Sequence, residues 1–207
     1  MLAGGRSTRF GRDKLVEPYR GVPLLHHALL RLAEVCDEMV VVVAPEAPDP
    51  SLPVGVSARV ARDPTEGEGP LAGVYAGLLA TRADVAIVAG GDMPELQIPV
   101  LLQMLRVSAE SPAEAVALAD GERFRPLPCV VRAERAVDVA HALLRSGRRR
   151  LRDLLDALRT AVVDEGTWHA LDPQRRTLVD VDEPADLDGE PPASSLDGEG
   201  AAEPGSG

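Results

Sequence analysis

Residues 2–14 read Leu2-Ala3-Gly4-Gly5-Arg6-Ser7-Thr8-Arg9-Phe10-Gly11-Arg12-Asp13-Lys14 and contain three glycines, two hydroxyl side chains and four cations. Because Gly4 and Gly5 have no Cβ, their backbone can take positive φ angles and lie close against a ligand with its N–H groups exposed. Such arrays of N–H groups bind anions, and phosphate is the commonest anion that needs one. The stretch therefore predicts a phosphate-binding loop. A surface turn with solvated cations is the alternative, and the spacing fits neither a dinucleotide fingerprint nor a P-loop.

The composition limits the class of protein. A chain of 207 residues suits one domain with a sizeable core, and because only 2% of the residues are aromatic that core must consist of Val, Leu and Ala. The net charge of −11 argues against nucleic acid as the main partner. The basic residues of 6–14 form an island on this acidic background, which suits an anionic small molecule.

The compartment follows from the cysteines and from the apolar runs. Cys36 and Cys129 are too few and too far apart for a disulfide framework or a zinc site, which favours a reducing cytoplasm. No apolar run reaches membrane-spanning length and no secretory signal is visible, so we expect a cytoplasmic protein with no membrane partner.

Strand and helix patterns alternate along most of the chain. Uninterrupted apolar runs predict buried strands, and apolar residues at helical spacing predict helices between them. The expected strands are 39–44, 56–61, 84–89, 115–119, 128–132, 160–163 and 178–181, and the expected helices run from 21–23 to Cys36 and over 71–79, 98–107, 134–144 and 149–158. This alternation predicts an α/β fold with three αβα layers around a mainly parallel, Rossmann-like sheet. We expect this domain to span 1–188, followed by a disordered acidic tail rich in Gly, Pro and Ser at 189–207.

The start of the chain is unusual for such a sheet. If 2–5 ends a strand, that strand needs about five residues, and only Met1 and Leu2 remain to supply it. We therefore expect either a short strand there or further residues upstream of Met1, and we favour the second.

Acidic side chains follow the expected strands. In open α/β sheets, ligands collect outside the carboxyl ends of the strands, where Asp63, Asp92 and the pair Asp180 and Asp182 would lie. Carboxylates around a phosphate-binding loop make sense if Mg²⁺ lies between them and the phosphates, because Mg²⁺ prefers one or two carboxylates plus phosphate oxygens. Asp92 is the best candidate, since six apolar residues lead directly into Gly90-Gly91-Asp92-Met93-Pro94. Its alternative role is an N-cap for the next helix.

Several motifs stand in the order of a known enzyme family. The pattern LAGG-x-S-x-R-x-G-x-DK at 2–14, GPLAG at 69–73, D-x-P at 92–94, DGER at 120–123 and the closing segment 178–187 together resemble the molybdenum cofactor guanylyltransferase family. The resemblance covers roughly residues 2–188, and the common order of the motifs carries it. It implies the nucleotide-diphospho-sugar transferase type of α/β fold. It also implies Mg²⁺-dependent transfer of GMP from GTP to molybdopterin-bound molybdenum cofactor, with release of pyrophosphate.

The resemblance also implies site residues. Catalytic roles fall to Lys14 and Arg9, as fixed cations at the transferring phosphate, and to Asp92. Asp92 and Asp182 are the expected metal ligands. The residues expected to bind GTP are Leu2, Ala3, Gly4, Gly5, Arg6, Ser7, Lys14, Asp63, Gly69, Pro70, Leu71 and Gly73. Physically, Leu71 opens a helix whose N-terminal amides can face a ligand, and a close helix–sheet contact that needs small residues is a compatible alternative.

The acceptor side of the expected site is less specific. Arg123 or Arg125 is a candidate to meet an acceptor phosphate, and the run 148–150 is either another such contact or a solvated helix start. The closing segment departs from the family pattern N-x-N-T-P-E-D-L, because Asp180 and Asp182 stand at the Asn positions and Glu183 at the Thr position. Each Asn-to-Asp exchange replaces a neutral amide by a charge that only accepts hydrogen bonds.

Three other functions stay open at this point. Two keep the chemistry and change the substrates: cytidylyl transfer to the same cofactor, or nucleotidyl transfer to a sugar or alcohol phosphate. The third is a catalytically silent nucleotide-binding protein, against which the joint presence of Lys14, Asp63 and Asp92 argues. The expected partners are GTP and the molybdopterin cofactor. Other proteins of cofactor biosynthesis or molybdoenzyme chaperones are further candidates.

Overall fold

The computed structural model describes residues 1–4, 13–64 and 69–188. Four residues with predicted roles, Gly5, Arg6, Ser7 and Arg9, lie outside the described residues, as does the expected acidic tail at 189–207. Within the described ranges, no helix is long and apolar enough to cross a membrane.

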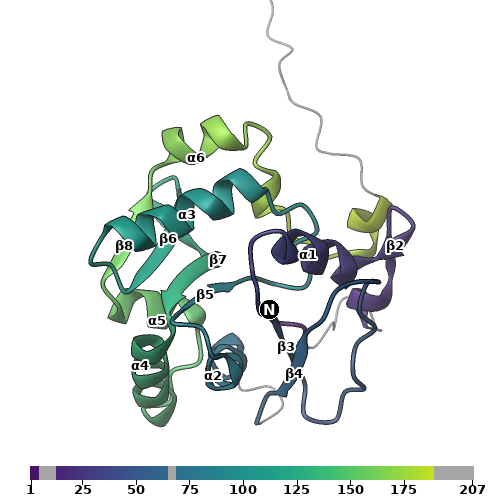
Figure 1. The fold of residues 1–207 in the computed structure, drawn as a ribbon, viewed down its shortest axis with the longest axis horizontal. Helices are drawn as coiled ribbons and strands as arrows, with labels where there is room; N and C mark the ends of the chain where they lie inside the picture. The colour runs from purple at the N-terminus through teal and green to yellow at the C-terminus, as the bar shows by residue number, and fades with distance from the viewer. Residues whose placement is uncertain (5–12, 65–68, 189–207) are drawn as a thin grey trace, which may run out of the picture.

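The elements alternate between strands and helices, as Figure 1 shows. The helices are α1 (Leu24–Ala33), α2 (Pro70–Ala80), α3 (Ile98–Glu110), α4 (Ala133–Arg145), α5 (Leu151–Ala157) and α6 (Glu165–Leu171). The strands are β1 (Pro18–Tyr19), β2 (Val22–Pro23), β3 (Val40–Val43), β4 (Arg59–Arg62), β5 (Val85–Val88), β6 (Ala115–Asp120), β7 (Arg123–Arg132) and β8 (Thr160–Val163). Three short 3₁₀ turns are η1 (Lys14–Val16), η2 (Arg176–Leu178) and η3 (Pro184–Asp188).

The backbone of a single residue links the two central groups of strands into one sheet. β3 and β4 pair in parallel, and β5, β7, β6 and β8 form a second ladder in that order. Leu2 joins the two, because it makes parallel bridges with Val42 of β3 and with Gly90 just after β5. β7 runs antiparallel to β5 and β6, whereas β8 is parallel to β6. Followed through Leu2, only β7 among these described strands runs against the others, which confirms the mainly parallel sheet.

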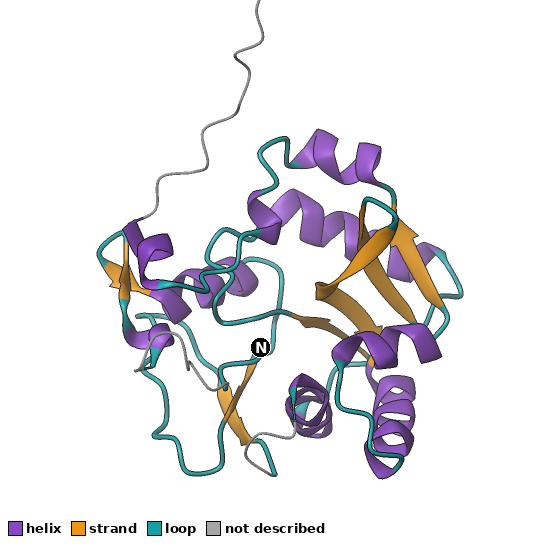
Figure 2. Ribbon diagram, turned by 180° about the vertical axis from the view of Figure 1, so that it is seen from behind, coloured by secondary structure: helices purple, strands orange, loops and turns teal. Residues whose placement is uncertain are grey.

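Helices cover both faces of this sheet, as the period-2 alternation of β6 requires. Ala115 and Ala117 pack with α2, α4 and α5 on one face, and Val116 and Leu118 pack with α3 and α6 on the other. Figures 1 and 2 show the same two helical layers with the strands between them. Trp168 of α6 is fully buried in the second layer, where its indole N–H donates to the carbonyl of Ala119 at 2.9 Å. The three-layer αβα prediction is therefore confirmed.

β7 begins earlier than the sequence indicated. Residues 120–126 were expected to be a loop, but Asp120 pairs directly with Arg123 across a tight turn in which Gly121 has a φ of 60°. The strand then runs on through two prolines, Pro126 and Pro128, which normally argue against strand structure. A register shift between Val116 and Leu118 of β6 accompanies this irregular part of the hairpin.

The expected strand at 178–181 is not a strand. The carboxylate of Asp172 accepts hydrogen bonds from the backbone N–H groups of Arg176 and Thr177, which turns the chain into η2. Beyond the turn, the N–H of Val181 donates to the carbonyl of Asp92 at 3.0 Å, and no strand ladder is formed in this described segment. The sequence reading also missed α6, whose N-cap Asp164 accepts from the N–H of Thr167.

Residues 1–3 pair with β3, and a cavity lies behind Met1. Ala3 N–H donates to the Val42 carbonyl, Val42 N–H donates to the Met1 carbonyl, and the Met1 amine donates to the Val40 carbonyl. Behind Met1, a cavity of about 350 Å³ lies between β3 and β5, with the C-terminal half of α2 beside it. Its apolar walls include Val40, Val85 and Ile87.

Candidate active site

The first feature of the candidate site is the end of the Leu2 strand. Leu2 N–H donates to the Ala89 carbonyl, and Gly91 N–H donates to the Leu2 carbonyl at 2.8 Å. This places Gly4, at the carboxyl end of the strand, against β3: a Cβ there would lie 3.1 Å from the Ala44 nitrogen. The predicted GTP-binding residues Leu2, Ala3 and Gly4 therefore lie at the carboxyl edge of the parallel strands.

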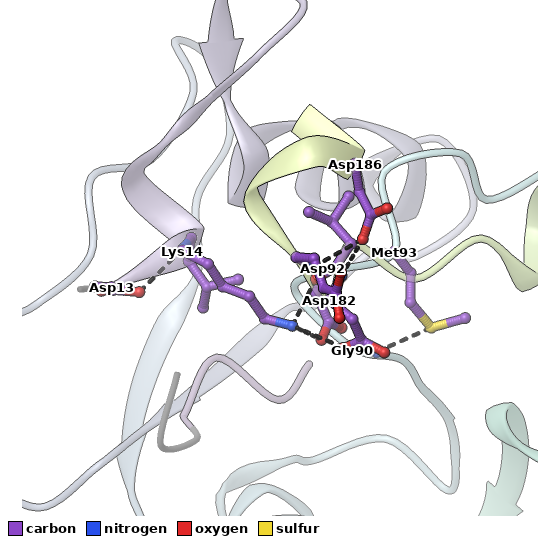
Figure 3. A network of polar contacts seen from close by, with 10 residues as sticks. Asp13, Lys14, Gly90, Asp92, Met93, Asp182 and Asp186 are labelled. Carbon is purple, nitrogen blue, oxygen red and sulfur yellow. Dashed lines mark hydrogen bonds and ion pairs between the residues drawn. The ribbon is translucent and has the colours of Figure 1, made fainter. Parts of the chain in front are cut away.

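Lys14 connects three segments that are distant in the sequence. Its ammonium Nζ lies 2.7 Å from Asp92 Oδ2, 2.7 Å from the Val181 carbonyl and 3.4 Å from Asp182 Oδ1 (Figure 3). Asp13 fixes the backbone before it, because its carboxylate accepts from the N–H of Leu15 at 3.0 Å. The predicted catalytic and metal-binding residues Lys14, Asp92 and Asp182 are thus in direct contact, and we call these three the Lys14 cluster.

The Lys14 cluster places two carboxylates around one ammonium group. The Lys14 side chain is 15% exposed, so desolvation lowers its pKa, but the hydrogen bond and charge of Asp92, with a further contribution from Asp182, leave the pKa above its ordinary value. The ammonium is therefore charged at neutral pH. Desolvation and the charge of Asp92 raise the pKa of Asp180 to about 6, although the residue keeps an exposed surface.

The loop before Asp92 needs two residues without a Cβ, Gly90 and Gly91, to fit against its neighbours. A Cβ at Gly90 would collide with Asp92 Oδ1, and a Cβ at Gly91 would lie 2.9 Å from Leu25 Cδ1. The alternative role of Asp92 as an N-cap does not hold, since α3 begins at Ile98 with Gln97 at its N-cap. Asp92 is a carboxylate of the sheet edge, paired with Lys14.

Residues 1–162 match the family described as the MobA-like NTP transferase domain. The chain belongs to this family. A probable molybdenum cofactor guanylyltransferase of Chloroflexus aggregans is 33% identical to it over 195 residues, covering 90% of this chain and 89% of that protein. The protein of the same description from Mycobacterium avium is 34% identical over 192 residues, covering 90% and 91%.

Solved structures support the fold of this NTP transferase. The molybdopterin-guanine dinucleotide biosynthesis protein A of Archaeoglobus fulgidus superposes with a TM-score of 0.70 at 20% identity, covering 90% of this chain and 92% of that one. The 2-C-methyl-D-erythritol 4-phosphate cytidylyltransferase of Thermus thermophilus gives a TM-score of 0.63 at 18% identity, covering 90% and 93%. At these identities the likeness shows the fold, which is the nucleotide-diphospho-sugar transferase type expected from the sequence.

In this MobA-like NTP transferase, the GPLAG segment is a packing element as well as a predicted binding segment. Gly69 has a φ of 83°, and a Cβ there would lie 2.9 Å from the Arg149 carbonyl oxygen. That same carbonyl accepts the N–H of Leu71 at 3.2 Å, and the Leu71 side chain is fully buried. The Leu71 amide therefore has a partner within the protein, and a ligand role for the amino end of this helix stays a prediction. The alternative of a close contact requiring small residues fits better here, and Pro70 occupies the first helical turn.

Gly73 lies beside both Leu2 and Asp63. A Cβ at Gly73 would come 3.2 Å from Leu2 Cδ2 and 3.6 Å from Asp63 Oδ2. Asp63 directly follows β4, and its N–H donates to the Val43 carbonyl at 2.9 Å. The predicted nucleotide-binding residues therefore form one group around Leu2 (with Asp63 and Gly73) and another around Arg149 (with Gly69 and Leu71).

Two features of the site were missed by the sequence reading. Asp186 accepts hydrogen bonds from the N–H groups of Asp182 and Glu183, both at 2.8 Å, and so fixes the backbone that presents Asp182. Its spacing after Glu183 and Pro184 is typical of a capping turn and could have predicted this. The second feature is compositional: Lys14 is the only lysine among the 207 residues, whereas the other cationic side chains are arginines.

The candidate acceptor arginines make contacts within the protein. Arg125 Nε lies 3.2 Å from Asp120 Oδ2, and one of its terminal nitrogens is 3.5 Å from the Leu178 carbonyl. Arg148 forms a bidentate pair with Asp153, and Arg149 donates to the Leu144 carbonyl at 2.9 Å. The first two members of the 148–150 run therefore stabilise the connection between α4 and α5.

Proposed function

We propose that this chain transfers GMP from GTP to molybdopterin-bound molybdenum cofactor and releases pyrophosphate, giving the guanine dinucleotide form. The observation that carries the proposal is the Lys14 cluster at the carboxyl edge of the parallel strands, in a chain of the MobA-like NTP transferase family. Open α/β sheets bind ligands at this edge.

The reaction needs no protein nucleophile. An oxygen of the acceptor's terminal phosphate forms a bond to the α-phosphorus of GTP. The bond between that phosphorus and the oxygen bridging to the β-phosphate breaks, and pyrophosphate leaves with the electron pair. Negative charge grows on the leaving pyrophosphate, so fixed cations accelerate the step. Lys14, charged at neutral pH, takes this role, and Arg9 is proposed to share it.

Asp92 and Asp182 are the residues that would hold Mg²⁺. Their carboxylates already enclose a cation, the Lys14 ammonium, so the donor set has the charge and the hard oxygens that Mg²⁺ prefers. Within the described ranges no group of three or more His, Cys, Asp or Glu forms a metal site. The proposal therefore rests on these two carboxylates alone. When bound, Mg²⁺ neutralises phosphate charge.

The remaining predicted residues are proposed to hold the nucleotide. Leu2, Ala3, Gly4, Asp63 and Gly73 surround the carboxyl end of the short first strand, where backbone groups can approach the GTP. Gly5, Arg6 and Ser7 continue this segment in the sequence, and Gly69, Pro70 and Leu71 shape the neighbouring start of α2. A reducing cytoplasm is the proposed location, because both cysteines are free thiols. Other proteins of cofactor biosynthesis or molybdoenzyme chaperones are proposed as partners.

The test is nucleotide binding measured by calorimetry with and without Mg²⁺, on the wild type and on Asp92→Ala. We expect GTP to bind only with Mg²⁺, and Asp92→Ala to weaken binding at least about tenfold, a loss of about 1.4 kcal/mol. Asp138→Ala, at an exposed position of α4, is the matched control and should bind as the wild type does.

Competition with other nucleotides separates the alternatives. Selective binding of CTP would keep the chemistry and move the chain to cytidylyl transfer. A folded protein that binds neither GTP nor CTP would refute the transferase proposal. GTP binding without pyrophosphate release in the presence of molybdopterin-bound molybdenum cofactor would indicate another acceptor or a silent binder.

A further inference from the structure

Glu95 is a half-buried carboxylate that receives three partners at once. Its Oε1 accepts the Tyr19 hydroxyl at 2.7 Å and lies 2.6 Å from a terminal nitrogen of Arg20, while its Oε2 lies 3.6 Å from Arg176 Nε. The Glu95 side chain is only 10% exposed. The close contacts with Tyr19 and Arg20 are of the strong, charge-assisted kind. Arg176 forms a longer ion pair without a hydrogen bond, so Glu95 holds it by charge. We call Glu95 with Tyr19, Arg20 and Arg176 the Glu95 hub.

The hub joins the three segments that carry the Lys14 cluster. Glu95 follows Asp92 in the same loop, and Tyr19 lies in β1, which follows the η1 turn that begins at Lys14. Arg176 begins η2, from which the chain leads to Val181 and Asp182. Each of the three members of the Lys14 cluster is therefore connected to Glu95 along its own stretch of chain.

A second layer of bonds reinforces the connection on the C-terminal side. Gln97 N–H donates to Thr177 Oγ1 at 3.2 Å, and the Gln97 side-chain amide donates to the Glu95 carbonyl at 2.8 Å. Thr177 is fully buried, and its N–H donates to Asp172 at 2.7 Å. The segment before Asp182 is thus held to the Glu95 loop at several points.

The backbone conformation at position 20 is unfavourable for arginine, which indicates that the Arg20 side chain is needed there for another reason. Arg20 and Gly21 have φ angles of 49° and 82°, and they connect Tyr19 to its partner Val22. A two-residue hairpin turn with both central residues at positive φ favours Asn, Asp or Gly at the first position. Arg at that position is strained, and strain of this kind concentrates at functional sites.

We propose that Glu95 is a positioning residue that sets the placement of Lys14 against Asp92 and Asp182. The inference rests on the function proposed above. Glu95 acts through Tyr19, Arg20 and Arg176 and is not itself a member of the Lys14 cluster. Burial and the hydrogen bond to Glu95 raise the pKa of Tyr19 to about 12, so this donor stays protonated at neutral pH.

Two variants separate positioning from stability. Glu95→Gln keeps the side-chain shape and an acceptor for Tyr19 but removes the charge that holds both arginines. Arg20→Asn removes one ion pair while placing a favoured residue at the strained turn, so it should keep or raise the melting temperature. The matched control is Glu114→Gln. Glu114 is also partly buried, at 19% exposed, and lies 3.2 Å from Arg135 and 3.7 Å from Arg159, but it precedes the amino end of β6.

The experiment combines enzyme kinetics with an NMR measurement on the Lys14 ε-amino group. Because Lys14 is the only lysine, protein made with isotope-labelled lysine gives one ε-amino NMR signal. We expect Glu95→Gln and Arg20→Asn to shift this signal and to lower kcat about ten- to hundredfold, since small misplacements of reacting groups cost that much. The KM for GTP should change less than about threefold, because the loss falls on the transition state. Glu114→Gln should leave the signal and kcat at wild-type values.

Two results would overturn the proposal. One is a Glu95→Gln protein with the wild-type lysine signal and the wild-type kcat. The other is a loss of kcat that is proportional to the loss of melting temperature in all three variants, including Glu114→Gln. A wild-type protein without GTP-dependent pyrophosphate release would instead refute the proposed function, and the lysine signal would still test the placement by Glu95.

Discussion

The ammonium of Lys14 lies 2.7 Å from Asp92 Oδ2, although 78 positions separate the two residues in the chain. This contact ties the residue that follows the glycine-rich stretch to the carboxylate that follows β5. The parallel topology brings it about, because both segments end at the same edge of the sheet. Asp182 approaches the same ammonium from the C-terminal part of the fold.

Replacing Lys14 should abolish transfer without unfolding the protein. Lys14→Met removes the cation and leaves Asp92 facing Asp182, so we expect kcat to fall at least about a hundredfold, as for other lost transition-state donors. The free energy of unfolding should fall by only about 1–3 kcal/mol, the cost of a buried group that loses its partner. Pyrophosphate release and urea unfolding measure the two effects. Transfer at the wild-type rate would exclude Lys14 from the reaction.

Adding one methyl group at Gly90 should misplace Asp92. The new Cβ of Gly90→Ala would collide with Asp92 Oδ1, so the carboxylate must rotate away from Lys14. We expect a loss of about tenfold or more in kcat from this displacement. Gly166→Ala in α6 is the control, because its Cβ would meet Asp164 Oδ1 at 3.3 Å and would gain helix propensity. Equal activity of the two variants would contradict the role given to Gly90.

The cavity behind Met1 should accept an added strand. Desolvation lowers the pKa of the Met1 amine to about 6, so this buried end is disfavoured in its charged form. An engineered Val-Ile-Val extension ahead of Met1 would replace the amine by a peptide group and bury apolar side chains between β3 and β5. We expect a gain of about 1–3 kcal/mol in the free energy of unfolding. A Ser-Gly-Ser extension is the control, and equal melting temperatures would show that the cavity does not bind a strand.

The two thiols should differ in reactivity and in pH dependence. Burial raises the pKa of Cys129 to about 12 and also raises that of the half-buried Cys36. Since the thiolate is the reactive form, iodoacetamide at pH 8 should modify Cys36 slowly and Cys129 only after unfolding. Raising the pH toward 10 should accelerate Cys36 alone, because Cys129 stays protonated below its pKa. Peptide mass spectrometry identifies the site, and rapid labelling of Cys129 in folded protein would contradict its burial.

The mainly parallel sheet and most of its strands could be predicted because the strands are strongly patterned, whereas the order of the strands comes from the structure alone. The runs that became β3 and β5 are uninterrupted and apolar. The carboxyl ends of β4 and β5 lead to Asp63 and Asp92, which the sequence placed on one edge of the sheet. The placement of Asp182 beside Lys14 also agrees with the motif order, although the segment before it is not a strand. Local apolar content at 178–181 suggested a strand, but the bonds from Asp172 turn the chain before a ladder can form.

Other parts depend on contacts that no local pattern reveals. The sequence predicts a loop at 120–126, and it is the pairing with β6 that makes Arg123 onward a strand. The Leu71 amide reads as a free helix terminus, but the Arg149 carbonyl, far along the chain, occupies it. The sequence did not predict the Glu95 hub for the same reason, because its members belong to three separate segments of the chain. Tertiary contacts of this kind override local propensity.

The single lysine has a chemical consequence for the whole protein. Acylating reagents and lysine-directed modifying enzymes have one ε-amino group to attack in this chain, and it is the one between Asp92 and Asp182. Acylation there would turn the ammonium into a neutral amide and leave the two carboxylates without their shared counter-charge. Attachment chemistry that is harmless on a lysine-rich surface would therefore act on this protein as an active-site reagent.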